Sequence, residues 1–192
     1  ETLFTAAAKS RIDYRNKSLV DFSDSDLSEI TLSGGESKIR IQSVEPGKWK
    51  IVEPFETAAS ATAVAALAVD LRNLRATDFV DDVAKHFSEY HFDKPDLKVL
   101  VNFKADSKRT ALDMALSRAV SDKPEEAGKT TTWVLVQGKP SIFKLETDPI
   151  RSILKPLDAF REKKLFEFSV DQAAQIDIER DDAAPLSLKK AG

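Results

Sequence analysis

One segment of the chain occurs twice, and this internal repeat constrains the fold more than any other feature of the sequence. Residues 14–23 recur as residues 160–169, and the same offset of 146 positions continues without a gap to residues 32 and 178. Six of these 19 positions are identical: Arg15, Lys17, Leu19, Phe22, Ser23 and Ile30. Chance similarity between two amphipathic strands is the alternative, but alternation alone would supply only the apolar matches and not the Arg-x-Lys-x-Leu start in register.

A genuine repeat would also set the length of the structural module. The chain has 192 residues, so one period of 146 leaves 46 residues over. A repeated unit has to bury its apolar face against its own elements or against a neighbouring unit. We therefore expect residues 1–160 to form one complete α+β module, with residues 1–17 as a lead-in. Residues 161–192 should either open a second repeat or supply strands that complete the first.

Alternation of apolar and polar residues predicts a sheet made largely of hairpins. Two alternating runs, 30–33 and 39–42, flank Gly34-Gly35, which predicts a tight turn because glycine accepts positive φ. Pro46-Gly47 predicts the next turn, before a strand that Pro54 ends. Residues 111–119 alternate like a strand, although their composition would also suit a helix. The predicted strands are 18–22, 30–33, 39–42, 49–53, 97–103, 111–119, 130–136 and 141–145.

Three other segments have the features of helices. The longest covers residues 57–75, with Thr57 as the N-cap. Its apolar face recurs at spacings of three and four, at Val64, Leu67, Leu71 and Leu74. A shorter helix is predicted over 81–90, and another where Asp148 can cap a helix that starts at Pro149. The elements together predict an α+β fold with at least one curled antiparallel sheet and the long helix packed on its apolar face.

The order of several short motifs resembles the bacterial family of domains of unknown function 4340. These motifs are Gly47-Lys48-Trp49, Glu53-Pro54, the leucine-rich helix, Phe79-Val80-Asp81-Asp82, Tyr90-His91-Phe92-Asp93-Lys94-Pro95 and Phe160-Arg161-Glu162-Lys163-Lys164-Leu165. The chain departs from the family's pattern at His91 and Phe92, where Gly-Leu is usual, and it has no glycine after Leu116. The resemblance implies an extracytoplasmic domain, commonly tethered by an N-terminal transmembrane helix. It also implies association with ABC-type transport systems, including those of gliding motility, and it supplies no catalytic residues.

Composition excludes several functional classes. The chain has no cysteine, so disulfides, cysteine metal sites and cysteine nucleophiles are impossible. With 29 basic and 32 acidic residues it has a net charge of −3, which lacks the basic footprint of a nucleic-acid-binding protein. No apolar run approaches the roughly 20 residues that cross a bilayer. The chain begins with Glu1, and we expect it to be an excised or processed piece of a longer protein.

The candidate sites are few, and each has a structural alternative. His86 and His91 are five apart, which does not match the spacing of metal ligands on one helix face. Asp78, Asp81 and Asp82 could act as acid and base in a hydrolase, but they suit the start of a helix better. Aromatic side chains can stack on a ligand as well as pack in a core. The candidate contact residues for a ligand or partner are Trp49, Trp133, Tyr90 and His91.

These observations predict a non-catalytic interaction module of a membrane-anchored envelope protein. We expect it to be periplasmic or on the cell surface, tethered to the inner membrane by a segment outside this chain, and to bind protein partners in a membrane assembly. No cofactor, metal or nucleic acid is expected, and the sequence leaves the oligomeric state open. The alternatives are a domain that binds a cell-envelope glycan or peptide, and a hydrolase that uses the acidic cluster.

Overall fold

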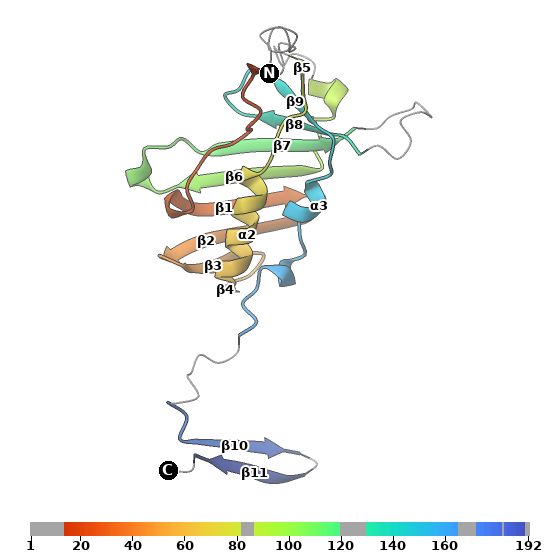
Figure 1. Ribbon diagram of the computed structural model, residues 1–192. Coiled ribbons are helices and arrows are strands. Elements are labelled where there is room, and N and C mark those ends of the chain that lie inside the picture. The colour runs from red at the N-terminus through yellow and green to blue at the C-terminus, as the bar shows by residue number, and fades with distance from the viewer. Residues whose placement is uncertain (1–13, 82–86, 120–129, 165–171, 182, 191–192) are drawn as a thin grey trace, which may run out of the picture. The chain divides into compact units, whose positions relative to one another are not determined.

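The computed structural model describes residues 14–81, 87–119, 130–164, 172–181 and 183–190 (Figure 1). The chain divides into two compact units, Glu1–Glu162 and Lys163–Gly192. Each unit is described by itself below.

An antiparallel sheet dominates the first unit. Within the described residues its strands are β1 (Leu27–Gly34), β2 (Ser37–Glu45), β3 (Lys48–Glu53), β4 (Thr57–Ala59), β5 (Asp78–Asp81), β6 (Leu97–Phe103), β7 (Leu112–Arg118), β8 (Thr132–Val136) and β9 (Ile142–Leu145). Their order across the sheet is β4-β3-β2-β1-β6-β7-β8-β9-β5, and all neighbours are antiparallel. The predicted antiparallel α+β fold is confirmed, and residues 112–118 form a strand rather than a helix.

The two predicted hairpin turns are also confirmed. Gly34 pairs with Ser37, so the turn between β1 and β2 consists of two residues. Gly35 in this turn has φ +57°, and Gly47 in the next turn has φ +78°, a region that glycine enters without a Cβ clash. The sequence therefore fixes both turns locally.

The long helix begins later than predicted. Helix α2 covers Ala61–Arg72, and its N-cap is Ser60, whose hydroxyl oxygen accepts a hydrogen bond from the Ala63 amide at 3.4 Å. Thr57 was the wrong cap, because it lies in β4 and pairs with Ile51 of β3. The predicted apolar face is confirmed, since Val64, Leu67, Leu71 and Leu74 are all buried.

Two other predicted elements are wrong. Residues 18–22 form no strand; instead Lys17 and Leu19 bond through their backbones to the chain just after α2, where Ser18 forms a single bridge with Arg75. The apolar side chains of 19–22 are nevertheless buried. The apolar pattern therefore indicates which side chains are buried, but it does not predict that this segment pairs in a sheet. The helix over 81–90 is also absent where the chain is described, because Asp78–Asp81 is strand β5 and Phe87–Tyr90 is a short 3-10 helix, η3. Residues 82–86 and the predicted loop 121–129 lie outside the described residues.

The remaining short helices lie between strands or after them. They are the 3-10 turns η2 (Asp24–Asp26), η4 (Ala105–Ser107) and η6 (Leu157–Ala159) and the helix α3 (Ile150–Ile153). The backbone amide of Ile150 donates to the carboxylate of Asp148 at 3.2 Å, as expected of a capping side chain, but the N-cap position of α3 is held by Pro149 and not by Asp148.

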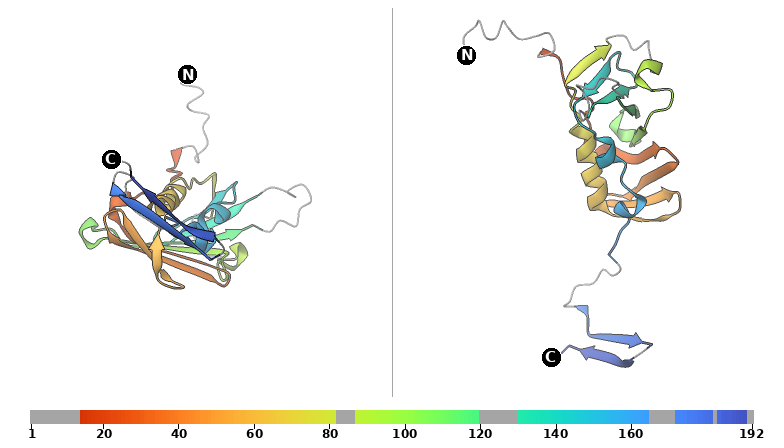
Figure 2. Two further views of the ribbon diagram at one scale, coloured as in Figure 1. Left: turned by 90° about the horizontal axis from the view of Figure 1, so that it is seen from below. Right: turned by 90° about the vertical axis from the view of Figure 1, so that its right-hand side faces the viewer.

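The core of the first unit lies between α2 and one face of the sheet. Apolar side chains of α2 share one buried cluster with alternate residues of the central strands. Figure 2 shows α2 on one side of the sheet and η3, in yellow-green, on the other. We call the side away from α2 the open face.

The second unit contains a two-stranded antiparallel sheet of β10 (Gln175–Arg180) and β11 (Ala183–Lys189). Ile176 pairs with Leu188, and Ile178 pairs with Leu186. The repeat places Ile176 and Ile178 at the positions of Ile30 and Leu32, which also lie in the first strand of a hairpin and pair with Ile41 and Ile39. The Ile30 and Leu32 side chains are fully buried, whereas those of Ile176 and Ile178 are 42% and 40% exposed. The repeat stays a prediction, since residues 165–169 of its second copy lie outside the described residues.

Candidate functional site

The alternation of side chains along each strand determines which residues lie on the open face. On β6, Leu97, Val99 and Val101 are completely buried on the α2 side. Lys98 and Leu100 lie between them and are exposed, Leu100 by 37%. Antiparallel sheets commonly cover one face and leave the other in water. The open face therefore presents both charged and apolar side chains to the solvent.

The connection between β5 and β6 crosses the open face and brings three of the four candidate residues together. The Tyr90 ring packs edge-on against Trp133, with 5.4 Å between ring centroids. The buried hydroxyl of Ser117 donates to the carbonyl oxygen of His91 at 3.2 Å. Tyr90, His91 and Trp133 therefore lie over neighbouring strands β7 and β8 on one side of the sheet.

Trp49 does not belong to this group. It lies on β3 opposite Ala59 and Ser43, and it packs against the main core on the α2 side. The Trp49 indole therefore packs against the core, which was the alternative to ligand contact, whereas the Trp133 indole packs under the Tyr90 ring.

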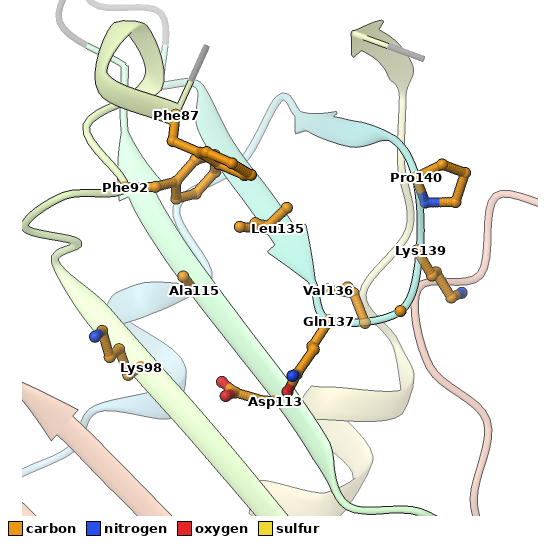
Figure 3. Close-up of a pocket in the computed structure, with 11 residues that line it drawn as sticks. Phe87, Phe92, Lys98, Asp113, Ala115, Leu135, Val136, Gln137, Lys139 and Pro140 are labelled. Carbon is orange, nitrogen blue, oxygen red and sulfur yellow. The ribbon is translucent and has the colours of Figure 1, made fainter. Parts of the chain in front are cut away.

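A pocket of about 550 Å³ opens on the same face beside η3 (Figure 3). Its lining comes from the β5–β6 connection, from β6, β7 and β8, and from the turn after β8. The lining residues are Phe87, Phe92, Lys98, Asp113, Ala115, Leu135, Val136, Gln137, Gly138, Lys139 and Pro140. Figure 3 shows the rings of Phe87 and Phe92 at one end and the side chains of Lys98, Asp113 and Gln137 toward the other. The pocket thus combines an aromatic wall with a polar end.

The strand register explains this arrangement. Lys98 is opposite Ala115, and Ala115 is opposite Leu135, so one row of side chains crosses three strands. Asp113 lies in the next row, where its carbonyl oxygen accepts a hydrogen bond from the Gln137 amide at 2.8 Å. Ala115 and Leu135 in the middle of the pocket thus share a row with Lys98, and Asp113 lies in the row beside it.

Lys139 closes the pocket at the turn after β8. Its ammonium donates to the carbonyl oxygen of Ser18 at 3.3 Å and lies 5.8 Å from the centroid of the Phe143 ring. Burial lowers the pKa of Lys139 below its usual range, because removal from water disfavours the charged form. Lys139 therefore ties this turn to the N-terminal segment.

Beyond the pocket the open face carries a group of ion pairs over β1, β2 and β3. Lys38 contacts the carboxylate of Glu53 at 2.9 Å, and Arg40 lies 3.5 Å from Glu53 and 4.0 Å from Glu29. The hydrogen bond from Lys38 lowers the pKa of Glu53, burial opposes this effect, and the charge of Arg40 adds to it. These charges lie in ion pairs, although within the described residues the buried Nε of Arg40 has no hydrogen-bond partner.

Asp78 and Asp81 of the acidic cluster lie in the edge strand β5. Asp78 accepts a hydrogen bond from the amide of Phe79 at 2.7 Å, and Asp81 pairs through its backbone with Ile142. Asp82 and His86 lie outside the described residues. Among the residues that are described, no group of three His, Asp or Glu side chains could hold a metal ion.

Sequence reasoning missed most of the pocket. Lys98, Asp113 and Leu135 are separate positions on three strands, and they meet only through the register of β6, β7 and β8. Phe87 and Phe92 reach them from the connection before β6, where the predicted helix over 81–90 included Phe87 but not Phe92. The one available signal was the alternation of the strands, which places Lys98 and Asp113 away from the core.

Comparison with known proteins gives one result. A family model described as a domain of unknown function (DUF4340) matches residues 1–95 and 49–192, which together cover the whole chain. No curated protein and no solved structure gives a significant match. No helix in the described ranges is long and apolar enough to cross a membrane.

Proposed function

Because the chain belongs to the DUF4340 family of domains of unknown function, we propose that it is a non-catalytic interaction module of an extracytoplasmic, membrane-anchored assembly. Its partners would be proteins of that assembly, of the kind that accompany ABC-type transport systems. We place it in the periplasm or on the cell surface, tethered to the inner membrane. The proposal takes its partner class and location from the resemblance stated above, and its contact surface from the fold.

The observation that carries the proposal is the open face of the sheet in the first unit. One face is covered by α2 and the core, whereas the other carries Leu100 and Phe87 with 37% and 42% of their surface exposed. The pocket beside η3 adds the apolar groups of Phe92, Ala115 and Leu135 to this face, and contiguous exposed apolar surface is typical of contact sites. The surface therefore offers a partner both apolar area and charge.

The second unit supports the same kind of role. We propose that the segment from Lys163 onward opens a second repeat, because β10 and β11 pair with each other in a hairpin. Arg161 and Glu162 still belong to the first unit, where they bond through their backbones to Ala59 and Ala58 of β4. One face of this hairpin exposes Ile176, Ile178, Leu186 and Leu188 by 40–52%. The opposite face carries polar residues, among which Gln175 donates to Asp177 and Ser187. This division into two faces suits a module whose apolar side is covered by further elements.

A cell-envelope peptide or glycan is the second candidate, and the pocket beside η3 is the observation that favours it. Pockets of roughly 300–1,000 Å³ with apolar walls and a few polar groups commonly bind small ligands. This alternative replaces a protein partner with a ligand and keeps the same location.

The proposed location can be tested with introduced thiols, since the chain has no cysteine. Glu36→Cys places a thiol in the exposed turn after β1, and Val64→Cys places one in the buried face of α2. In spheroplasts of the natural host, a membrane-impermeant maleimide should label full-length Glu36→Cys and leave Val64→Cys unlabelled. Labelling of Glu36→Cys only after lysis would contradict an extracytoplasmic location.

The proposed contact surface can be tested by photocrosslinking in the same cells. A benzophenone amino acid replaces Leu100 on the open face, or Val69 on the exposed side of α2, which has a similar exposure of 42%. We expect cross-links to a membrane-associated protein from position 100 and not from position 69. Equal cross-linking from both positions, or none from position 100, would contradict a partner on the open face.

A further inference from the structure

We propose that the pocket beside η3 binds a peptide segment that presents one large apolar side chain between an acidic and a basic residue. The inference rests on the proposed interaction function and names the chemistry of the partner. It is argued from the pocket walls, from the two charges at its rim and from the rigidity of its frame.

The apolar side chain would lie against the aromatic wall. Phe87 and Phe92 face the pocket from the β5–β6 connection, and Ala115 and Leu135 form its floor (Figure 3). Phe87 has 42% of its surface exposed. Insertion of an apolar side chain here would remove this surface from water.

The frame of the pocket is held in place before any ligand arrives. The amide of Phe92 donates to the carbonyl oxygen of Phe87 at 3.0 Å, and that of His91 donates to Ser88 at 3.1 Å. The same turn is fastened to the sheet by the contact between Tyr90 and Trp133. A preformed wall reduces the ordering cost of binding.

The charges at the rim point to a ligand that carries both signs. Lys98 and Asp113 extend from adjacent strands on the open face, and within the described residues neither side chain has a hydrogen bond or an ion pair. The neighbouring Arg118 differs, since it pairs with Asp96 at 3.2 Å and with Asp148 at 3.1 Å. Unpaired charges of opposite sign beside an apolar pocket complement a partner with the reverse arrangement.

This combination favours a peptide over other ligands. An anionic lipid or a nucleic acid would meet Lys98 but would be repelled by Asp113. A neutral glycan would leave both charges without a partner of opposite sign. A peptide can place a carboxylate near Lys98, a cation near Asp113 and an apolar side chain between them.

The test uses blocked tripeptides as probes and the complete 192-residue chain labelled with ¹⁵N. Acetyl-Glu-Phe-Lys-amide and acetyl-Lys-Phe-Glu-amide are titrated, because the direction of the peptide is open. At least one should shift the amide signals of residues 87–92, 113–115 and 135–137. Replacement of its Phe by Ala should weaken binding about tenfold, the effect of losing about 1.4 kcal/mol.

Charge reversal supplies the sharper comparison. Asp113→Lys should make Glu-Phe-Glu the preferred peptide, and Lys98→Glu should make Lys-Phe-Lys the preferred one. Asp106→Lys, an exposed reversal in η4 outside the pocket, is the matched control and should keep the original preference. The dispersed ¹⁵N spectrum of each variant shows that it is folded.

Three results would overturn the proposal: no shifts at the pocket with either peptide, equal binding of the Ala peptide, or an unchanged preference after both reversals. Shifts at the same amides with an N-acetylglucosamine trisaccharide and none with the peptides would overturn it in favour of a glycan. The thiol and cross-linking experiments do not depend on the pocket. They can therefore succeed when this inference fails, and the two failures remain distinguishable.

Discussion

The hydroxyl of Ser117, buried in β7, donates a hydrogen bond at 3.2 Å to the carbonyl oxygen of His91, which lies 26 residues earlier in the chain. This bond joins the β5–β6 connection to the sheet beneath it. It satisfies a buried polar group, and it holds the turn that carries Phe87 and Phe92 to the pocket.

Removal of this bond should loosen the turn. Ser117→Ala is expected to lower the free energy of unfolding by about 1 kcal/mol, the usual net value of one hydrogen bond. Urea unfolding measures the change, and Ser28→Ala on β1 is the control, because the half-buried Ser28 hydroxyl makes no hydrogen bond within the described residues. Equal stability of Ser117→Ala and wild type would show that the bond contributes nothing.

His91 has φ +59°, in the left-handed region that costs an L-residue roughly 1–2 kcal/mol. His91→Gly should therefore leave stability unchanged or raise it by about 0.5 kcal/mol, since glycine also loses more entropy on folding. His91→Val should lower stability by about 1 kcal/mol, because a β-branched residue fits this region poorly. Lys108→Gly, at φ +55°, is the matched control and should behave like His91→Gly. A destabilised His91→Gly would contradict the backbone argument.

Gly34 should tolerate a methyl group less well than Gly35. A Cβ at Gly34 would lie 2.6 Å from the carbonyl oxygen of Asp96 and 2.6 Å from a methyl group of Leu154, whereas a Cβ at Gly35 meets nothing within 4 Å. Gly34→Ala is expected to cost about 3 kcal/mol through overpacking against backbone. Gly35→Ala should cost about 1 kcal/mol through its positive φ alone. Thermal unfolding of both variants shows which one is less stable. Gly35→Ala would be the less stable variant if the positive φ of Gly35 cost more than the steric clash at Gly34.

The packing of α2 on the sheet can be tested by truncation. Leu67 is completely buried, so Leu67→Ala should lower the unfolding free energy by about 3 kcal/mol through lost burial and the cavity left behind. Val69 lies on the same helix with 42% of its surface exposed, and Val69→Ala should change stability by less than about 0.5 kcal/mol. Similar losses in chemical denaturation would argue against α2 as the cover of the core.

Stability should fall in acid partly through Glu53. The hydrogen bond from Lys38 holds the pKa of Glu53 below its usual range. A depressed folded pKa stabilises the protein above the unfolded value, and this contribution is lost as the pH falls through the folded pKa. Lys38→Met should bring the Glu53 pKa back toward its usual range and weaken this loss of stability in acid.

The control for this titration is Lys98→Met, which removes the same charge from the open face but breaks no ion pair in the described structure. Urea midpoints between pH 7 and pH 3 and carboxyl NMR titration measure both variants. An unchanged Glu53 titration in Lys38→Met would show that Arg40 alone sets the pKa.

Local chemistry determined much of the fold in advance. The alternation of 30–33 and 39–42 around Gly34-Gly35 specifies a hairpin without any distant contact, because turn geometry and side-chain direction are properties of the segment itself. The spacing of Val64, Leu67 and Leu71 likewise specifies which face of α2 is buried. The family resemblance also rested on local motifs, and the match over the chain confirms it.

The tertiary structure decided which segments meet. Residues 18–22 have the pattern of a strand, but their backbone bonds to the chain at the end of α2. Their side chains are therefore buried although the segment does not pair as a strand of the sheet. Thr57 and Ser60 are both good caps by type, and pairing of Thr57 with β3 left the role to Ser60. The pocket depends on the register of three strands and on a connection that crosses them, and such long-range pairing is a property of the whole fold. The sequence by itself thus determined the elements and their buried faces, and only the tertiary structure brought Lys98, Asp113 and the aromatic wall together.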